Sequence, residues 1–206
     1  HTLCEQDAQP LHDTLKEVER QFGEWLPKMK WLNFGGGHHI TREGYDIALL
    51  ERCICEMKEK YDLEIFLEPG EAVALNAGVL LTKVEEIVEN SIQIAILDTS
   101  AACHMPDVLE MPYRPPLQDG YEAEEKEYTY RLAGPTCLAG DVIGDYSFEE
   151  PLKRGDTLTF EDMAIYTMVK NNTFNGMRLP AIVLEDKDGE CRVVRQFEYE
   201  DFKMRL

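Results

Sequence analysis

The chain has 206 residues, of which 44% are apolar and 30% are charged, a balance typical of a globular protein with a substantial core. Its formal net charge of −19 argues against a nucleic acid as a partner, because a polyanion would be repelled. No apolar run approaches the roughly 20 residues that span a bilayer, so we expect no membrane contact. An acidic surface suits a cationic small molecule instead.

The cysteines and histidines predict neither a disulfide framework nor a metal site. The cysteines show no scaffold spacing and no paired metal-ligand motif; they are Cys4, Cys53, Cys55, Cys103, Cys137 and Cys191. Cys53 and Cys55 lie two residues apart on a predicted helix, so their side chains point about 200° apart. His38, His39 and His104 are not spaced like zinc ligands. We therefore expect no metal and a reducing, cytoplasmic location.

Helix and strand patterns alternate between residue 9 and about residue 70. Apolar residues on one helical face predict two helices, and apolar runs predict two strands. In chain order, these segments are 11–22, 31–34, 47–57 and 63–67. Each strand ends in a polar or glycine-rich loop, as at the active face of a (β/α)₈ barrel. A doubly wound parallel sheet would show the same alternation and stays the competing architecture.

The length of this pattern limits what it can build. It covers only about 70 residues, whereas a closed (β/α)₈ barrel takes about 250. The chain also begins without methionine, and residues 1–5 read like the end of a strand that started earlier. We therefore expect a C-terminal piece of a longer protein, in which residues 1–76 are the C-terminal portion of the barrel.

After residue 76 the pattern changes to strands separated by turn signals such as Lys153-Arg-Gly155 and Lys187-Asp-Gly189. The predicted strands are 78–83, 92–98, 127–133, 157–160, 181–184 and 192–197. This spacing favours an antiparallel β-sandwich or barrel over residues 77–206. The predicted fold class is therefore α/β plus β.

Two strand ends carry residues suited to an anionic ligand with a basic nitrogen. Gly35, Gly36 and Gly37 lack a Cβ atom, so the backbone can approach a ligand closely, and successive N–H groups can hold a phosphate. A tight loop without a ligand would have the same composition. Glu68 lies at the next strand end, before Pro69, where its carboxylate must be paired or solvated. It could equally be an acid favoured at a helix N-terminus.

Three motifs then point to one family. They are Gly134-Pro-Thr-Cys137-Leu-Ala-Gly-Asp141, Asp162-Met-Ala-Ile-Tyr166-Thr and Thr173-Phe-Asn-Gly176. In this order they resemble the active-site edge of the pyridoxal-phosphate decarboxylases with an alanine-racemase-like fold, which act on ornithine, arginine, diaminopimelate or carboxynorspermidine. The resemblance covers essentially the whole chain. It implies a pyridoxal-phosphate cofactor and a homodimer with shared active sites.

The resemblance also assigns roles to single residues. Cys137 would be offered across the dimer interface to protonate the reacting carbon, and Asp141 is retained in the same motif. Glu68 would pair with the pyridine nitrogen of the cofactor, and residues 35–37 would bind its phosphate. Tyr166 would reach the same phosphate, and His1 would stack on the ring. No lysine here lies in a context resembling the family's Schiff-base lysine, which we expect upstream.

One departure from the family indicates the substrate. Several relatives carry arginine at the position of Glu71, where it holds the phosphate, so the charge is reversed here. A cation must balance Glu71, and the ammonium group of a polyamine-type substrate would do so. With the stretches 31–41 and 98–115, this resembles the branch that decarboxylates carboxynorspermidine or carboxyspermidine. Asp107 would bind a substrate nitrogen and Arg114 a carboxylate.

Three functions stay open at this point. The first is decarboxylation of a carboxylated polyamine. The second is decarboxylation of diaminopimelate, ornithine or arginine, against which Glu71 and Leu138 count because relatives often carry arginine and an acid there. The third is a non-catalytic relative that binds pyridoxal phosphate for regulation, although such a protein would not need Cys137.

Overall fold

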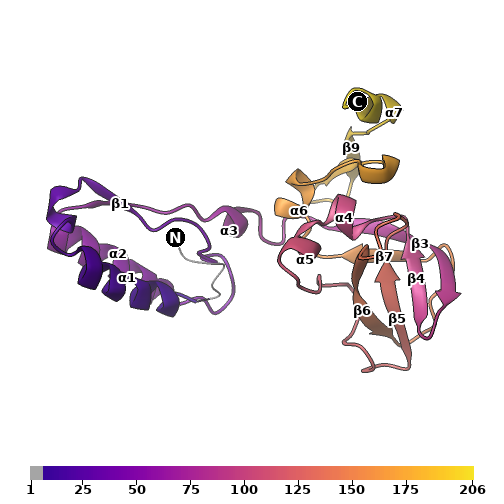
Figure 1. Cartoon of the computed structure of the whole chain (residues 1–206), viewed down its shortest axis with the longest axis horizontal. Helices are drawn as coiled ribbons and strands as arrows, with labels where there is room; N and C mark the ends of the chain where they lie inside the picture. Colours follow the sequence, from indigo (N-terminus) through magenta and orange to yellow (C-terminus); the bar gives the residue numbers. More distant parts are fainter. Residues whose placement is uncertain (1–6) are drawn as a thin grey trace. The chain divides into compact units, whose positions relative to one another are not determined.

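The structure is a computed structural model that describes residues 7–206. It divides into two compact units, His1–Leu75 and Asn76–Leu206, and each is considered by itself. The N-terminal unit contains, in chain order, α1 (Gln9–Phe22), η1 (Leu26–Lys28), β1 (Trp31–Asn33), α2 (Ile47–Tyr61), β2 (Glu64–Phe66) and α3 (Gly70–Ala74) (Figure 1). Strands β1 and β2 pair in parallel, with Leu32 opposite Ile65. The predicted alternation of helix and strand is therefore present.

Local chemistry explains where the second helix begins and ends. The side chain of Asp46 accepts a hydrogen bond from the Leu49 N–H at 2.8 Å and caps the start of α2. Asp62 adopts a left-handed conformation (φ 54°) and ends it. Within α2, Cys53 is buried and Cys55 is exposed, as the helical spacing predicts.

The core of the N-terminal unit lies between the helices and the two strands. Its buried residues come from every long element; they include Leu11, Leu15, Leu26, Phe34, Leu50, Cys53, Met57 and Leu63. Two parallel strands are common to a (β/α)₈ barrel and to a doubly wound sheet. The complete barrel is not contained in this chain.

The C-terminal unit is built on a five-stranded sheet in the order β6-β5-β4-β3-β7. The strands are β3 (Leu80–Glu89), β4 (Gln93–Leu97), β5 (Tyr128–Ala133), β6 (Val142–Phe148) and β7 (Thr157–Phe160). The segment 117–121 bridges both edges, because Leu117 pairs with Phe160 of β7 and Tyr121 with Ser147 of β6. The sheet is thereby closed on itself.

The expectation of a purely antiparallel sheet was wrong at one pair. Strands β4 and β5 run parallel, with Ala95 opposite Leu132. A parallel pair requires a long crossover connection, and residues 98–127 provide it. This connection contains α4 (Ala101–His104) and α5 (Asp107–Glu110).

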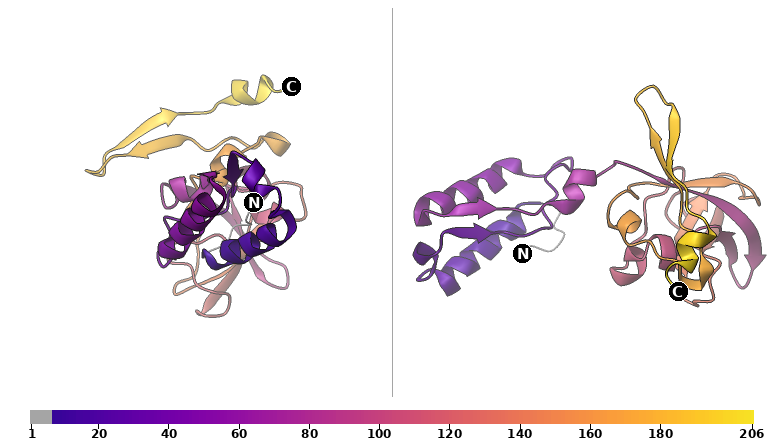
Figure 2. Two further views of the ribbon diagram at one scale, coloured as in Figure 1. Left: turned by 90° about the vertical axis from the view of Figure 1, so that its left-hand side faces the viewer. Right: turned by 90° about the horizontal axis from the view of Figure 1, so that it is seen from above.

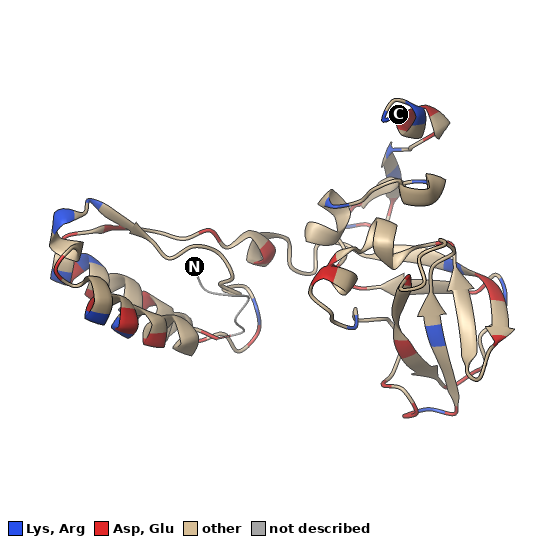
Figure 3. Cartoon of the chain, in the orientation of Figure 1, with Lys and Arg blue, Asp and Glu red and all other residues tan. Residues whose placement is uncertain are grey.

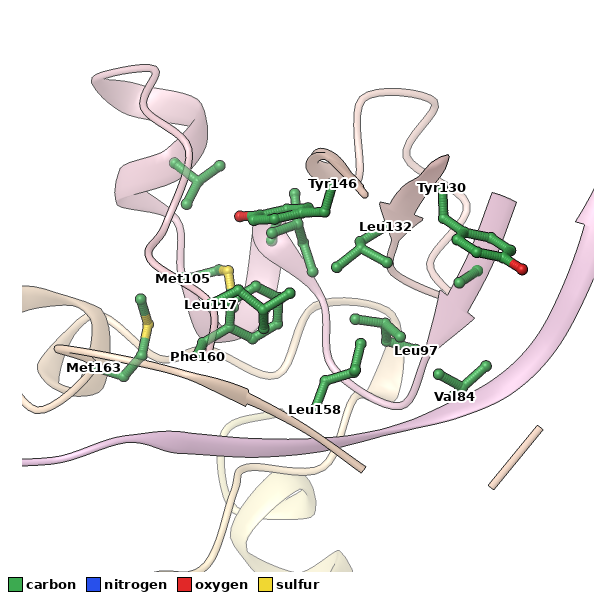
Figure 4. Packing of buried hydrophobic residues seen from close by; sticks show 14 of the residues in the cluster. Val84, Leu97, Met105, Leu117, Tyr130, Leu132, Tyr146, Leu158, Phe160 and Met163 are labelled. Carbon is green, nitrogen blue, oxygen red and sulfur yellow. The ribbon is translucent and has the colours of Figure 1, made fainter. Parts of the chain in front are cut away.

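The closed sheet surrounds a continuous apolar core. Tyr146, Phe160, Leu97 and Leu132 are fully or almost fully buried and point toward one another (Figure 4). The rings of Tyr146 and Phe160 meet edge to face with centroids 6.2 Å apart, a favourable aromatic geometry. The Tyr146 hydroxyl donates to the Pro115 carbonyl at 2.7 Å, which satisfies the polar end of this buried ring.

The last predicted strands do not join this sheet. Strands β8 (Ile182–Glu185) and β9 (Cys191–Arg195) form a separate antiparallel hairpin that extends away from it (Figure 2). The Lys187-Asp-Gly189 turn connects them, with Gly189 at φ 84°. The remaining helical segments are α6 (Tyr166–Val169), η2 (Phe174–Gly176) and α7 (Tyr199–Lys203). No helix in the range 7–206 is long and apolar enough to cross a membrane.

Candidate active site

The strand-end residues of the N-terminal unit form the first group of the candidate site. The glycine loop follows β1, and Gly35 and Gly37 adopt left-handed conformations with φ 75° and 82°. Residues with a side chain rarely adopt these angles, so the loop requires glycine there. Glu68 lies two residues after the end of β2 and is exposed. Because β1 and β2 are parallel neighbours, both features lie at the same edge.

Asn33 joins the glycine loop to Glu68. Its Oδ1 accepts a hydrogen bond from the Gly35 N–H at 2.8 Å, and its Nδ2 donates to Glu68 Oε1 at 2.6 Å. The Glu68 N–H also donates to the Gly35 carbonyl at 2.8 Å. Sequence reasoning missed Asn33, although an amide at the end of an apolar strand was a usable signal. These hydrogen bonds thus hold the loop and the carboxylate together.

This arrangement fits pyridoxal phosphate chemically. The cofactor has an anionic phosphate and a ring nitrogen that is protonated beside a carboxylate. A backbone without Cβ atoms can receive the first, and the exposed Glu68 carboxylate can receive the second. The Gly35 N–H is already bound to Asn33, so Gly35 shapes the loop and does not offer that N–H to a ligand.

Glu71 has a cationic candidate within its own unit. His39 Nε2 lies 3.4 Å from Glu71 Oε2, and the side chains are 8% and 27% exposed. The pair is close enough for an ion pair when His39 is protonated, but it is not aligned as a hydrogen bond, since Nε2 makes none. His39 therefore balances the charge of Glu71 only in its protonated form.

The loop with Cys137 forms the second group, in the C-terminal unit. It connects β5 to β6 and is closed by backbone bonds from the Gly134 N–H to the Asp141 carbonyl (2.8 Å) and from the Asp141 N–H to the Leu138 carbonyl (2.9 Å). A Cβ atom at Gly134 would lie 2.2 Å from Asp141 Oδ2, so only glycine fits. Cys137 is exposed at the tip.

Asp141 is the internal support of this loop. Its buried carboxylate accepts hydrogen bonds on both oxygens from described residues. Oδ1 accepts from the Ser100 hydroxyl (2.9 Å) and the Ala102 N–H (3.1 Å), and Oδ2 accepts from the Thr136 hydroxyl (2.6 Å) and the Thr136 N–H (3.3 Å). Asp141 therefore connects the cysteine loop to α4, which gives it a structural role that the motif alone left open.

The other side of α4 is bound to the segment that contains the Phe-Asn-Gly turn. The Asn172 N–H and side-chain amide donate to the carbonyls of Cys103 (2.9 Å) and Ala102 (2.8 Å). His104 Nδ1 accepts from the Ser100 N–H (3.3 Å), so the ring proton is on Nε2, which donates to the Arg178 carbonyl (3.0 Å). Burial lowers the pKa of His104, which stays neutral.

The predicted proton donor itself contacts that turn. Cys137 Sγ lies 2.9 Å from Asn175 Oδ1, and the Cys137 N–H lies 3.5 Å from the same oxygen. The cysteine and the Phe-Asn-Gly motif are 38 residues apart in sequence. Two of the three motifs that suggested the family therefore meet in space.

The predicted substrate residues of the C-terminal unit already have charged partners. Lys170 donates to Asp107 at 2.8 Å and also pairs with Glu110; these contacts raise its pKa, the one to Asp107 most strongly. Arg114 pairs with Glu122, donates to the Tyr121 carbonyl at 3.1 Å and lies 4.6 Å from the centre of the Tyr146 ring. These contacts give Arg114 a role in closing the sheet.

The remaining predicted residues are less constrained. Tyr166 begins α6 and is exposed, so its role toward the phosphate stays a prediction. His1 lies outside the described residues, as does Cys4. Within residues 7–206, no three His, Cys, Asp or Glu side chains gather as metal ligands. Acidic residues are distributed over both units (Figure 3).

Comparison with known families identifies the class of protein to which this chain belongs. A family model described as pyridoxal-dependent decarboxylase, C-terminal sheet domain, matches residues 13–164. The chain therefore belongs to the pyridoxal-dependent decarboxylases. This confirms the family resemblance, the cofactor class of the family and, for the fold, the C-terminal part of the decarboxylase architecture.

Individual relatives show which members of the family this chain is similar to. The chain is 45% identical to a carboxynorspermidine/carboxyspermidine decarboxylase of Campylobacter jejuni and 47% identical to a carboxyaminopropylagmatine decarboxylase of Synechocystis. Both matches cover 100% of this chain but only 56% and 54% of those relatives. It also resembles the crystal structure of carboxynorspermidine decarboxylase complexed with norspermidine from Campylobacter jejuni, with a TM-score of 0.89, 46% identity and coverage of 100% of this chain and 59% of that one.

Proposed function

We propose that the full-length protein decarboxylates carboxynorspermidine or carboxyspermidine with pyridoxal phosphate, to give norspermidine or spermidine. The observation that carries this proposal is the hydrogen bonding of Asn33 to both the glycine loop and Glu68, within a chain of this family. The similarity to the Campylobacter jejuni decarboxylases supports the substrate class. We further propose that β1 and β2 are two strands of a (β/α)₈ barrel completed by residues outside this chain.

At the cofactor, the residues of this chain would bind and hold protons. Bound pyridoxal phosphate supplies an electron sink for the pair released when the carboxylate leaves. Glu68 keeps a proton on the ring nitrogen, and Asn33 fixes the orientation of Glu68. In the loop 35–37, Gly35 shapes the turn while Gly36 and Gly37 would bind the phosphate together with Tyr166, and His1 would stack on the ring.

At the substrate, Cys137 donates a proton to the carbon that loses the carboxylate. We propose that this thiol acts in the active site of a second subunit, so that a homodimer shares its sites. Glu71 and Asp107 would bind ammonium groups of the substrate, in exchange for His39 and Lys170. Arg114 would contribute a carboxylate contact only after leaving its partners in the sheet.

Carboxyaminopropylagmatine is the second candidate substrate. The identity of 47% to a decarboxylase of this compound is as high as that to the carboxynorspermidine enzyme. The candidates are all cationic amines that carry a carboxylate: the two carboxylated polyamines differ in chain length by one methylene, and the agmatine compound carries a guanidinium group. Diaminopimelate, ornithine and arginine remain less favoured, because Glu71 suits a substrate with several positive charges.

Product analysis tests this proposal directly. The full-length protein is incubated with carboxynorspermidine, carboxyspermidine, carboxyaminopropylagmatine, diaminopimelate, ornithine and arginine, and the amine products are identified. We expect release of norspermidine or spermidine at the highest kcat/KM. Decarboxylation of diaminopimelate alone, or of no compound, would refute the proposed function.

Glu68→Gln tests the cofactor assignment. Glutamine keeps an oxygen for the Asn33 amide but cannot hold a proton on the ring nitrogen, so kcat should fall about 100-fold or more while the cofactor stays bound. Glu64→Gln is the matched control, since Glu64 is an exposed acid on β2, the strand that precedes Glu68. Turnover of Glu68→Gln at the control rate would exclude this role for Glu68.

The shared site is tested by mixing two inactive variants. Cys137→Ala and Glu68→Gln dimers are combined under conditions in which subunits exchange. If each site takes Cys137 from one subunit and Glu68 from the other, each mixed dimer has one intact site, and about a quarter of the wild-type activity should return. No recovery after proven exchange would mean that Cys137 does not act across the interface.

A further inference from the structure

The contact between Cys137 and Asn175 links the proposed proton donor to a specific acceptor. The thiol sulfur lies 2.9 Å from Asn175 Oδ1, and the Cys137 N–H approaches the same oxygen at 3.5 Å. An amide oxygen can only accept, so the contact requires the protonated thiol as donor. Both side chains are exposed, and no other described partner holds the sulfur in place.

The turn around Asn175 is fixed independently of this contact. Asn172 and Phe174 are bound to α4, through the Asn172 N–H to the Cys103 carbonyl (2.9 Å) and Cys103 Sγ to the Phe174 carbonyl (3.4 Å). Asp141 holds the Cys137 loop to the same helix. Because α4 supports both partners, the amide and the thiol meet at a defined position.

Asn175 also adopts a left-handed conformation, with φ 60°. Asparagine is favoured there for its backbone alone, so the residue type does not by itself indicate a role toward the thiol. The two explanations differ in one respect. A backbone role is fulfilled equally by glycine, whereas a role of the amide oxygen is lost with the side chain.

We propose that Asn175 is the positioning residue for Cys137, and that its amide oxygen orients the thiol and keeps it protonated until it is used. This inference rests on the proposed function of Cys137. Rotation about the Cβ–Sγ bond would turn the proton from Asn175 toward the substrate while the sulfur stays in place. The S–H bond then breaks, its electron pair stays on sulfur, and the proton forms the new C–H bond at the carbon that lost CO₂. The thiolate regains a proton from water.

The amide oxygen also favours return to the protonated state. A thiolate has no proton to donate, and its charge is repelled by the partial negative charge of Asn175 Oδ1. Removing this oxygen should therefore increase the fraction of thiolate at a given pH. Replacing it with a carboxylate should decrease that fraction further, since two negative charges would lie in contact.

Three variants of the full-length protein separate these effects. Asn175→Gly keeps the left-handed turn and removes the amide, and Asn175→Asp keeps the shape and makes the acceptor anionic. Asn76→Gly is the matched control, because Asn76 is a second left-handed asparagine (φ 58°) of the same unit. The reaction of Cys137 with iodoacetamide is measured by mass spectrometry of its peptide, with the exposed Cys191 as internal reference.

We expect alkylation of Cys137 to become about fivefold faster in Asn175→Gly and about fivefold slower in Asn175→Asp, with no change in Asn76→Gly or at Cys191. In turnover, kcat should fall about tenfold in Asn175→Gly, whereas KM should change less than twofold. Alkylation rates in both Asn175 variants equal to those of wild type would overturn the inference.

The alkylation readout does not depend on catalysis. Altered alkylation with unchanged kcat would support the contact and overturn the proposed role of Cys137 as proton donor. Unchanged alkylation with a lower kcat would overturn the contact and leave the proposed role of Cys137 intact. The failure of this inference and the failure of the proposed function are therefore distinguishable.

Discussion

Replacement of Asp141 by asparagine should weaken the support of the cysteine loop more than its small chemical change suggests. All four groups that bind the carboxylate are donors: the hydroxyls of Ser100 and Thr136 and the N–H groups of Ala102 and Thr136. An asparagine has one oxygen and one NH₂ group. In either orientation, the NH₂ group faces a backbone N–H that cannot reverse its direction.

The magnitude follows from this mismatch. One buried N–H loses its acceptor, which costs about 1–3 kcal/mol, and the remaining bonds lose the strengthening of a charged acceptor. The Ser100 hydroxyl is restricted in how it can reorient toward the new NH₂ group, because its oxygen already accepts a hydrogen bond from the Cys103 N–H at 3.1 Å. We therefore expect Asp141→Asn to lower the free energy of local unfolding by about 2–4 kcal/mol.

Asp145→Asn is the matched control on β6. Asp145 pairs with Arg131 at 2.8 Å, but the two side chains are 39% and 42% exposed. Arg131 lowers the pKa of Asp145, yet a pair this exposed contributes about 0–1 kcal/mol. The same replacement should thus have a much smaller effect there.

Hydrogen exchange of the full-length protein measures this difference locally. Peptides that cover residues 98–105 and 134–142 should exchange faster in Asp141→Asn, by the factor that corresponds to the lost free energy. Tryptophan fluorescence would be a poor substitute, because Trp25 and Trp31 both lie in the N-terminal unit. Equal exchange of these peptides in Asp141→Asn and Asp145→Asn would refute the reasoning.

Further predictions concern single residues of the two groups. Burial lowers the pKa of His104 below its usual 6.5, so the unfolded state binds a proton first as the pH falls. The stability should therefore decrease below about pH 6.5, and it should decrease less steeply in His104→Gln. Urea titrations monitored by hydrogen exchange measure this difference. Gly134→Ala should increase exchange in 134–142, since its Cβ would meet Asp141; unchanged exchange would contradict this. The double variant Glu71→Gln/Asp107→Asn should lower kcat/KM for carboxynorspermidine about tenfold relative to ornithine, and each single variant should lower it less, because each acid exchanges a nearby cation for a substrate ammonium group; an unchanged ratio in the double variant would exclude ammonium binding by these acids.

Apolar periodicity was sufficient to predict most elements of the fold. Of the apolar residues that share a predicted helical face, Leu11, Leu15, Leu50 and Met57 are buried. Phe22 and Ile47, at the ends of their helices, are exposed. Strand β6 was missed, because Gly144 and Asp145 interrupt its apolar run. Gly144 has a packing reason: a Cβ atom there would lie 3.0 Å from the Arg114 side chain. Periodicity does not reveal such constraints.

The polar contacts of the candidate site could not be predicted in the same way. The motifs identified Glu68 and Cys137 as chemical groups, but their supports, Asn33 and Asn175, depend on distances across the fold. The parallel pairing of β4 and β5 is similar, because strand direction depends on the path of a 30-residue connection whose local sequence does not specify it. Residue types indicate the chemistry, whereas tertiary structure determines which groups meet.

Glu71 shows how contacts across the fold change an interpretation that was drawn from the sequence. A reversed charge does require a cation, and sequence alone offered only the substrate. The structure adds His39 beside Glu71 and Lys170 beside Asp107. At Asp107 a substrate ammonium group would replace the Lys170 ammonium, and at Glu71 it would replace His39 when that imidazole is protonated, so the net gain at each acid is the difference between two ion pairs. Such an exchange contributes little to affinity for a single charge. Under the proposed function it favours a substrate with more than one positive charge, because each acid then adds its own small gain.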